Sequence, residues 1–339
     1  MRKNGRSSAP LRGVDIMQTN KSRRDFLKAS IAAAGAAGLG AATTGVADAS
    51  AAHATASAPE SVAQAASDAA SQGAGPLPVK KGILVDMLPK ELSYTDRFKL
   101  AREVGFEALQ VNTTPKPAEA IEIKRAAETA GMRIDSVMNM DHWKCPLSSA
   151  DPAVVEKSLQ GMRTSLHNAN VWGAKYVLLV PAVVNAETSY RDAWRRSQTQ
   201  IRKLVPLAEQ LKVVIALEEV WNKFLLSPLE FATYVDEFRS PWVKAWFDVG
   251  NVVLYGYPQD WIRTLGHRIV DMHVKDFKHR DDGYQWVNLG DGDVDWPEVR
   301  KALGEIHYSG TIITELDGGD EAYLRDLSQR FDRLVIGKE

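Results

Sequence analysis

Short apolar runs and longer segments of helical periodicity alternate along the chain from residue 81 onward. The runs are Gly82–Leu88, Ala108–Asn112, Arg133–Met138, Tyr176–Val180, Val213–Leu217, Val243–Phe247, Ile269–His273 and Thr311–Glu315. The helical segments include Tyr94–Val104, Pro117–Ala130, Ala153–Asn170, Tyr190–Leu211, Pro228–Phe238 and Pro297–Ile306. Such alternation is typical of βαβ units with a parallel sheet. Eight units in about 250 residues predict an α/β fold, a single (β/α)8 TIM barrel.

Local signals support these boundaries. Polar residues precede proline where two helices should begin, and glycines stand where three should end. These positions are Ser227, Asp295, Gly105, Gly131 and Gly173. An open, doubly wound sheet is the alternative, but no Gly-x-Gly-x-x-Gly follows the first run.

The N-terminus has a different composition. The run Ser22-Arg23-Arg24-Asp25-Phe26-Leu27-Lys28 precedes an apolar stretch rich in Ala and Gly, and Ala47-Asp48-Ala49 follows as a small-x-small cleavage pattern. This order resembles a twin-arginine export signal. The resemblance implies that the twin-arginine translocation machinery is a partner, that the protein is exported or periplasmic, and that it travels folded.

Three segments follow from these patterns. Residues 1–49 are predicted to be the signal peptide and residues 81–339 the barrel. Residues 50–80 consist largely of Ala, Ser, Gly and Pro. They offer too little apolar surface to fold, so we expect a linker.

Composition excludes several classes of function. The formal net charge is −1 and no basic stripe follows the N-terminus, so no nucleic-acid partner is expected. The single cysteine, Cys145, excludes an internal disulfide and a cysteine-rich zinc site. No apolar run after residue 50 has the roughly 18 residues of a membrane helix, so no stable membrane insertion is expected.

The last four runs each end in an ionisable side chain. Glu218, Asp248, His273 and Glu315 stand at or beside the ends of successive predicted strands. Catalytic residues of such barrels lie at these carboxyl ends. Three carboxylates and one imidazole suit a divalent ion with open coordination positions, so the sequence predicts one metal site. Mn²⁺ is the expected ion, with Mg²⁺, Co²⁺ and Zn²⁺ as alternatives.

Alternation along the fifth run distinguishes two adjacent glutamates. If Glu218 points into the barrel, so do Ala216 and Val214, while the larger Ile215 and Leu217 face the helices. We therefore assign Glu218 to the metal. Glu219 is expected either at the surface or as a partner of a ligand.

The motifs around these residues are similar to those of sugar-phosphate isomerases and epimerases of the xylose isomerase-like superfamily. They are Ala216–Asn222, Phe224–Pro228, Phe247–Asn251, His273–Asp276 and Leu289–Trp296. The resemblance implies that Glu218, Asp248, His273 and Glu315 bind the metal and that Glu218 and Glu315 are the catalytic acid and base. It is closest to hexulose-phosphate isomerases and ketose 3-epimerases. Two positions depart from the ketose 3-epimerases: Asn251 replaces a frequent His, and Phe224 stands near an expected Glu.

The resemblance implies a carbohydrate substrate and an enediolate mechanism. The metal would chelate two adjacent sugar oxygens, one Glu would remove a proton and the other would return it. Lys275, Asn251, Trp221 and His142 are the expected substrate contacts. Instead of contacting substrate, Lys275 could form an ion pair with Asp276 or another neighbour. His142 could likewise serve only in the packing of its loop.

Other functions remain open at this point. An exported metal-dependent lyase or hydrolase acting on a keto-sugar or keto-glycoside is one, because an enediolate can also eliminate. A non-catalytic sugar-binding protein is another. An apurinic endonuclease is disfavoured by seven scattered histidines and the net charge of −1. The sequence leaves the sugar, its phosphorylation and a homo-oligomeric state undecided.

Overall fold

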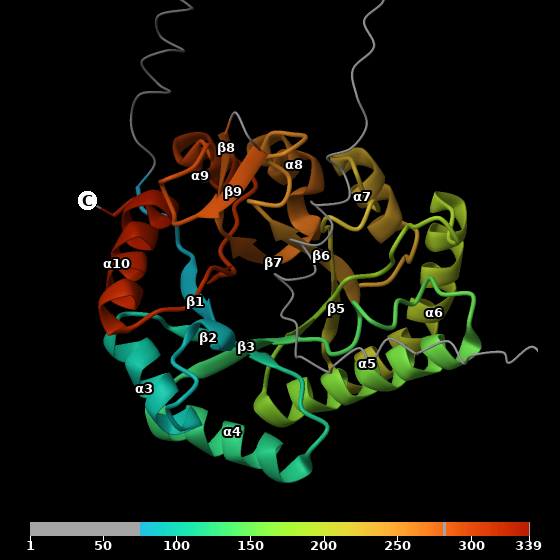
Figure 1. Ribbon diagram of the computed structural model, residues 1–339, viewed down its shortest axis with the longest axis horizontal. Coiled ribbons are helices and arrows are strands. Elements are labelled where there is room, and N and C mark those ends of the chain that lie inside the picture. Colours follow the sequence, from blue (N-terminus) through green and yellow to red (C-terminus); the bar gives the residue numbers. More distant parts are fainter. Residues whose placement is uncertain (1–74, 281–282, 339) are drawn as a thin grey trace, which may run out of the picture. The chain divides into compact units, whose positions relative to one another are not determined.

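The computed structural model describes residues 75–280 and 283–338; the predicted signal peptide and most of the predicted linker lie outside these residues. Eight parallel strands form a closed barrel in the order β1, β10, β7, β6, β5, β4, β3, β2 (Figure 1). Their bounds are Lys80–Leu84 (β1), Ala108–Asn112 (β2), Arg133–Met138 (β3), Tyr176–Leu179 (β4), Val214–Glu218 (β5), Val243–Asp248 (β6), Ile269–Val274 (β7) and Thr311–Thr314 (β10). The predicted (β/α)8 barrel is confirmed.

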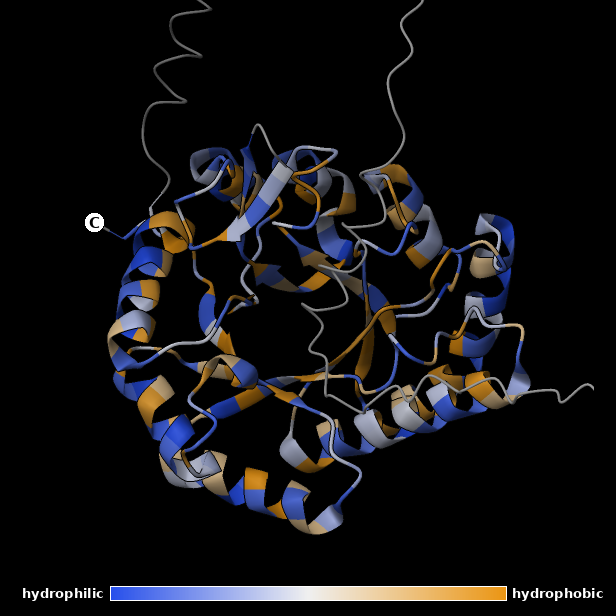
Figure 2. Cartoon of the chain, in the orientation of Figure 1, coloured by the Kyte–Doolittle hydropathy of each residue, from blue (hydrophilic) through white to orange (hydrophobic). Residues whose placement is uncertain are grey.

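Helices follow the strands and surround the barrel (Figure 1). They are α3 (Tyr94–Glu103), α4 (Pro117–Ala130), α5 (Pro152–Trp172), α6 (Tyr190–Leu211), α7 (Pro228–Asp236), α8 (Pro258–Leu265), α9 (Trp296–Glu305) and α10 (Glu321–Phe331). Hydrophilic and hydrophobic residues alternate along these helices, as expected of elements that cover a core on one side (Figure 2). No helix in the described ranges is both long and apolar enough to cross a membrane.

The predicted boundary residues have the expected roles. The side chains of Ser227 and Asp295 accept hydrogen bonds from backbone N–H groups in the first turns of α7 and α9. Gly131 and Gly173 adopt φ values of 65° and 72° just after α4 and α5, a left-handed conformation that costs glycine little.

Two elements differ from the sequence-based expectation. The first strand ends at Leu84 rather than Leu88, and Val85–Met87 forms a 3-10 turn. Asp86 interrupts the apolar run there and accepts a hydrogen bond from the side-chain amide of Asn112 at the end of β2. A two-stranded antiparallel hairpin, β8 (Asp276–Arg280) and β9 (Gly283–Val287), also follows β7.

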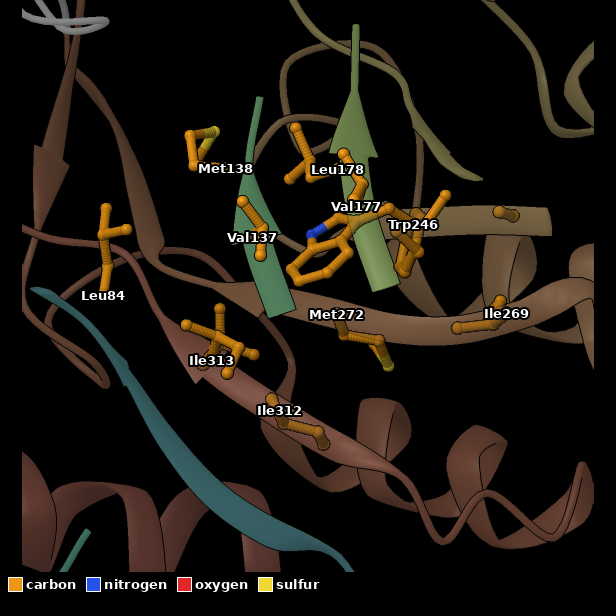
Figure 3. Close-up of a cluster of buried hydrophobic side chains, with 14 of the residues drawn as sticks. Leu84, Val137, Met138, Val177, Leu178, Trp246, Ile269, Met272, Ile312 and Ile313 are labelled. Atoms are coloured by element: carbon orange, nitrogen blue, oxygen red, sulfur yellow. The ribbon is translucent and has the colours of Figure 1, made fainter. Parts of the chain in front are cut away.

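The strands carry buried hydrophobic side chains both inside the barrel and on its outer face, under the helices. Ile313, Met272, Leu178 and Trp246 belong to this core (Figure 3). Register aligns the strand ends: His273 pairs with Asp248 on one side and with Ile313 on the other. The ends of β5, β6, β7 and β10 therefore lie at one level of the barrel.

Candidate metal centre

Four ionisable side chains converge at the carboxyl ends of β5, β6, β7 and β10. Glu218 ends β5, Asp248 ends β6, His273 is in β7, and Glu315 directly follows β10. One ligand atom from each residue lies within 4.8 Å of those of the other three. Three of these side chains are fully buried and that of Glu315 is 12% exposed. The structure thus brings together all four residues that the sequence singles out.

His273 is held by three polar neighbours, two at Nδ1 and one at Nε2. Its Nδ1 lies 3.0 Å from Glu218 Oε1 and 3.4 Å from Glu315 Oε2. Its Nε2 lies 2.8 Å from Oε1 of Gln110, a fully buried residue in β2. An amide oxygen only accepts, so Nε2–H donates to Gln110. Nδ1 also faces acceptor oxygens, and a cation bound among them would take its lone pair. No pattern in the sequence points to Gln110, which stands inside the apolar run Ala108–Asn112.

Asp248 uses its two oxygens differently. Oδ1 accepts hydrogen bonds from the backbone N–H groups of Gly250 and Asn251, at 2.9 Å and 3.2 Å. This fixes the turn after β6. Oδ2 lies 2.5 Å from Lys275 Nζ. Burial raises the pKa of Asp248, and the Lys275 ammonium opposes that shift.

Lys275 bridges two of the converging carboxylates. Its Nζ lies 2.5 Å from Asp248 Oδ2 and 2.8 Å from Glu315 Oε2. The same ammonium lies 4.9 Å from the ring centroid of Trp286 in β9. The carboxylate of Asp276 instead accepts hydrogen bonds within the following loop. Lys275 thus lies at the centre, and the carboxylates it contacts belong to the predicted ligands.

Glu219 is fully buried, which excludes the surface alternative. Its Oε1 accepts a hydrogen bond of 2.9 Å from the backbone N–H of Asp248. Burial, followed by the charges of Glu218 and Asp248, raises the pKa of Glu219 well above its usual range. Glu219 therefore supports the backbone that carries Asp248, while Glu218 faces the interior as alternation predicts.

Trp221 and Asn251 are linked to each other. The Trp221 Nε1–H donates to the backbone oxygen of Asn251 at 2.8 Å, and the Asn251 amide donates to the backbone oxygen of Glu219 at 2.9 Å. Phe224 is fully buried among the rings of Tyr190 and Trp194. The two hydrogen bonds hold the loop after β5 against the turn after β6, whereas Phe224 packs the same loop onto α6.

His142 lies in the loop after β3 and is buried. Its Nδ1 accepts a hydrogen bond of 3.4 Å from the backbone N–H of Val180, and its ring packs edge-on against Trp143. A role of His142 in substrate binding stays a prediction.

The donor set fits a divalent cation. Three carboxylates and an imidazole form a predominantly oxygen site, typical of Mn²⁺, Mg²⁺ or Co²⁺ and compatible with Zn²⁺. The fit extends beyond the donors, because a metal-binding imidazole commonly donates its second N–H to an acceptor, which Gln110 provides here.

Comparisons with known proteins agree with this geometry. Residues 98–333 match the model of the xylose isomerase-like TIM barrel family, and residues 22–40 match that of the twin-arginine translocation pathway signal sequence. The chain is 26% identical over 247 residues to L-ribulose-5-phosphate 3-epimerase UlaE of Escherichia coli O1:K1, covering 69% of this chain and 86% of that protein.

Solved structures share the fold. The apo form of 3-keto-D-glucoside 4-epimerase YcjR from E. coli has a TM-score of 0.63 at 15% identity, covering 75% of this chain and 99% of that one. The IOLI protein with a bound zinc atom has a TM-score of 0.63 at 17% identity, covering 76% and 97%. The signal match indicates export by the twin-arginine pathway, and the chain belongs to the xylose isomerase-like TIM barrel family.

Proposed function

We propose that this protein is a divalent-metal-dependent epimerase or isomerase of a sugar or sugar phosphate that works in the periplasm. Its assignment to the isomerase class follows from relatives that are themselves named epimerases. The observation that carries the proposal is the convergence of Glu218, Asp248, His273 and Glu315 within 4.8 Å at the catalytic end of the barrel.

Glu218, Asp248, His273 and Glu315 would hold the ion. A divalent ion bound there polarises substrate oxygens and stabilises the negative charge that develops on them when a neighbouring C–H loses its proton. Mn²⁺ is the ion we propose, with Mg²⁺, Co²⁺ and Zn²⁺ as alternatives.

The two glutamates are the proposed acid and base. Glu218 comes from β5 and Glu315 follows β10, with β6 and β7 between them in the barrel. Their carboxylates reach His273 Nδ1 from different strands, at 3.0 Å and 3.4 Å. One carboxylate can therefore take a proton from one side of a bound sugar and the other can return a proton from the opposite side. Return to the same carbon gives epimerisation, and return to the adjacent carbon gives isomerisation.

The remaining polar groups orient these side chains. Gln110 fixes the proton of His273 on Nε2, and Glu219 holds the backbone of Asp248. Lys275 lies between Asp248 and Glu315, where its ammonium can donate to a substrate oxygen. We propose that Asn251, Trp221 and His142 line the substrate site around this centre.

Solvent exchange tests the proposal. Metal-loaded protein in D2O is incubated with free ketoses, phosphorylated ketoses and 3-keto sugars, and deuterium at the carbon beside the carbonyl is measured by mass spectrometry. We expect exchange with at least one substrate and its loss, together with the metal, in His273→Ala. His167→Ala, which removes an exposed histidine of α5, is the matched control. Equal metal content in the two variants, or no exchange with any sugar, contradicts the proposal.

A further inference from the structure

The β8–β9 hairpin carries its aromatic residues on one face. Phe277 pairs with Trp286, and His279 pairs with Tyr284. Directly opposed residues of an antiparallel pair share a face, and residues two apart along a strand return to it. Lys278, which pairs with Gln285, therefore lies on the opposite face. The two faces of this hairpin thus differ in chemistry.

Trp221 joins the aromatic face from the loop after β5. Its ring centroid lies 5.1 Å from that of Trp286, 5.4 Å from Tyr284 and 5.7 Å from Phe277. We call Trp221, Phe277, Tyr284 and Trp286 the aromatic wall. Phe277 is fully buried, whereas the other three remain partly accessible to solvent. The wall therefore keeps ring surface that a ligand can cover.

The wall begins at the metal centre. The Trp286 ring lies 4.9 Å from Lys275 Nζ, which also contacts Asp248 and Glu315. A Cβ built on Gly250 would lie 2.5 Å from Lys275 Cγ and 3.1 Å from Trp286 Cζ3. The absence of a side chain at Gly250 thus lets Lys275 and Trp286 pack onto the turn after Asp248. A ligand at the centre has Trp286 as its neighbour.

The wall also extends away from the centre. Tyr284 precedes Trp286 by two residues, which is about 7 Å along a strand. That length accommodates one more sugar ring beyond a ring held at the centre. Aromatic side chains offer an apolar surface to the C–H faces of such a ring, and their polar edges bind its hydroxyl groups.

The cations of this region do not favour a phosphate on the wall. Lys275 is shared by Asp248 and Glu315, and His279 Nδ1 lies 2.9 Å from Asp293 Oδ2. Lys278 and Arg280 occupy strand positions that alternate with those of the aromatic residues. The basic groups on the aromatic face thus already have carboxylate partners.

We propose that the aromatic wall binds a second, uncharged ring attached to the reacting sugar, so that the substrate is a neutral glycoside or disaccharide rather than a phosphorylated monosaccharide. This inference rests on the proposed function and specifies its substrate class. Export by the twin-arginine pathway agrees with it, because export takes the enzyme away from the cytosolic pool of sugar phosphates.

Calorimetric binding tests this inference separately from turnover. The metal-loaded protein is titrated with lactulose and isomaltulose, two neutral disaccharides with a ketose unit, and with D-fructose and D-fructose 6-phosphate. We expect at least one disaccharide to bind about tenfold or more tightly than fructose, since burial of one aromatic side chain contributes on that scale. Fructose 6-phosphate should bind no more tightly than fructose.

Variants identify the surface responsible. Trp286→Ala and Tyr284→Ala should each abolish most of the preference for the disaccharide, whereas Trp286→Phe keeps a ring and should retain most of it. Gln285→Ala, on the opposite face, is the matched control. Tightest binding of fructose 6-phosphate, equal affinity for fructose and both disaccharides, or an undiminished preference in Trp286→Ala and Tyr284→Ala overturns the inference. Disaccharide binding that depends on Trp286 without solvent exchange would overturn the proposed reaction instead.

Discussion

The Oε1 atom of Gln110 lies 2.8 Å from Nε2 of His273, across the barrel interior, where both side chains are fully buried. The two residues belong to β2 and β7, which are not neighbours in the barrel. Their contact turns Nδ1 of His273 toward Glu218 and Glu315. Gln110 is thus a positioning residue for the candidate metal ligand.

Replacement of Gln110 by Met should weaken metal binding. The variant keeps a similar volume but removes the acceptor for the Nε2–H of His273. Loss of such a partner typically lowers metal affinity about 10- to 100-fold. Titration with Mn²⁺ against a competing chelator measures the effect. Gln110→Glu keeps an oxygen at this position and should restore much of the affinity. Wild-type affinity in Gln110→Met would contradict the role.

Glu218→Gln and Glu315→Gln should separate metal binding from proton transfer. Gln keeps an oxygen ligand but cannot act as a base, so metal content should stay near normal. Loss of a general base typically lowers the rate about 10²- to 10⁴-fold. Solvent deuterium exchange and elemental analysis of the same samples measure both quantities. Glu219→Gln keeps the acceptor for the Asp248 N–H and serves as the control. Wild-type exchange in a metal-loaded Glu218→Gln or Glu315→Gln would remove that residue from the mechanism.

Asp276→Asn should destabilise the fold, because Asp276 organises the loop that precedes α9. Its Oδ1 accepts from the backbone of Phe277 and Val294, and its Oδ2 accepts from Gly290 N–H and Trp296 Nε1–H. An amide nitrogen in place of one oxygen leaves buried donors unsatisfied, at a cost of about 1–3 kcal/mol each. The free energy of unfolding in urea measures this loss.

Asp291→Asn is the matched control for Asp276→Asn. It removes an exposed ion pair with Arg330 from the same loop and should cost at most about 1 kcal/mol. Equal stability of the two variants would exclude a special role of Asp276.

The ion pair of Asp236 and Arg268 should stabilise the fold at neutral pH but not at a pH low enough to protonate Asp236. Arg268 donates to both carboxylate oxygens, at 2.8 Å and 2.6 Å, and this holds the pKa of Asp236 below its usual value. The contribution is therefore present above the ordinary aspartate pKa of about 3.9 and is lost as the pH falls through the lower folded value. Asp236→Asn should cost about 0.2–1 kcal/mol at neutral pH, since the pair is exposed. In urea unfolding, the difference in free energy of unfolding between the wild type and Asp236→Asn should disappear below about pH 4. A difference that stays constant with pH would contradict this assignment.

Replacing Arg23 and Arg24 together by Lys should retain the precursor in the cytoplasm. The expectation rests on the match of residues 22–40 to the twin-arginine signal. Immunoblots of periplasmic and cytoplasmic fractions measure the distribution. Arg6→Lys, outside the motif, should leave export unchanged. Undiminished periplasmic protein in the double variant would refute dependence on the paired arginines.

The barrel and its four converging ionisable residues were predictable from local patterns. Strand periodicity predicts the strand ends, and parallel strands bring their carboxyl ends to one level. Glu218, Asp248, His273 and Glu315 could therefore be grouped from the sequence alone. Their role as metal ligands stays a prediction.

Contacts across the barrel were not predictable in this way. Gln110 lies in the middle of a strand, and periodicity within that strand carries no information about which residue it meets on the far side. The hairpin had a detectable signal, because Phe277 and His279, and then Tyr284 and Trp286, recur at spacings of two. β8 begins at Asp276, two residues after the end of β7 at Val274, so the alternation of the hairpin runs on from that of β7 in the sequence.

The closure of the barrel has a consequence for when the protein can finish folding. β1 pairs with β10, the first and last strands of the described barrel, so a ribosome must synthesise the chain past Thr314 before this pairing can form. Until then β1 and β7 each present an unpaired edge, which is prone to associate with other chains. The barrel can therefore close only after its last strand has been synthesised. A transport route that accepts folded proteins suits a barrel in which the last strand pairs with the otherwise open edge of the first strand.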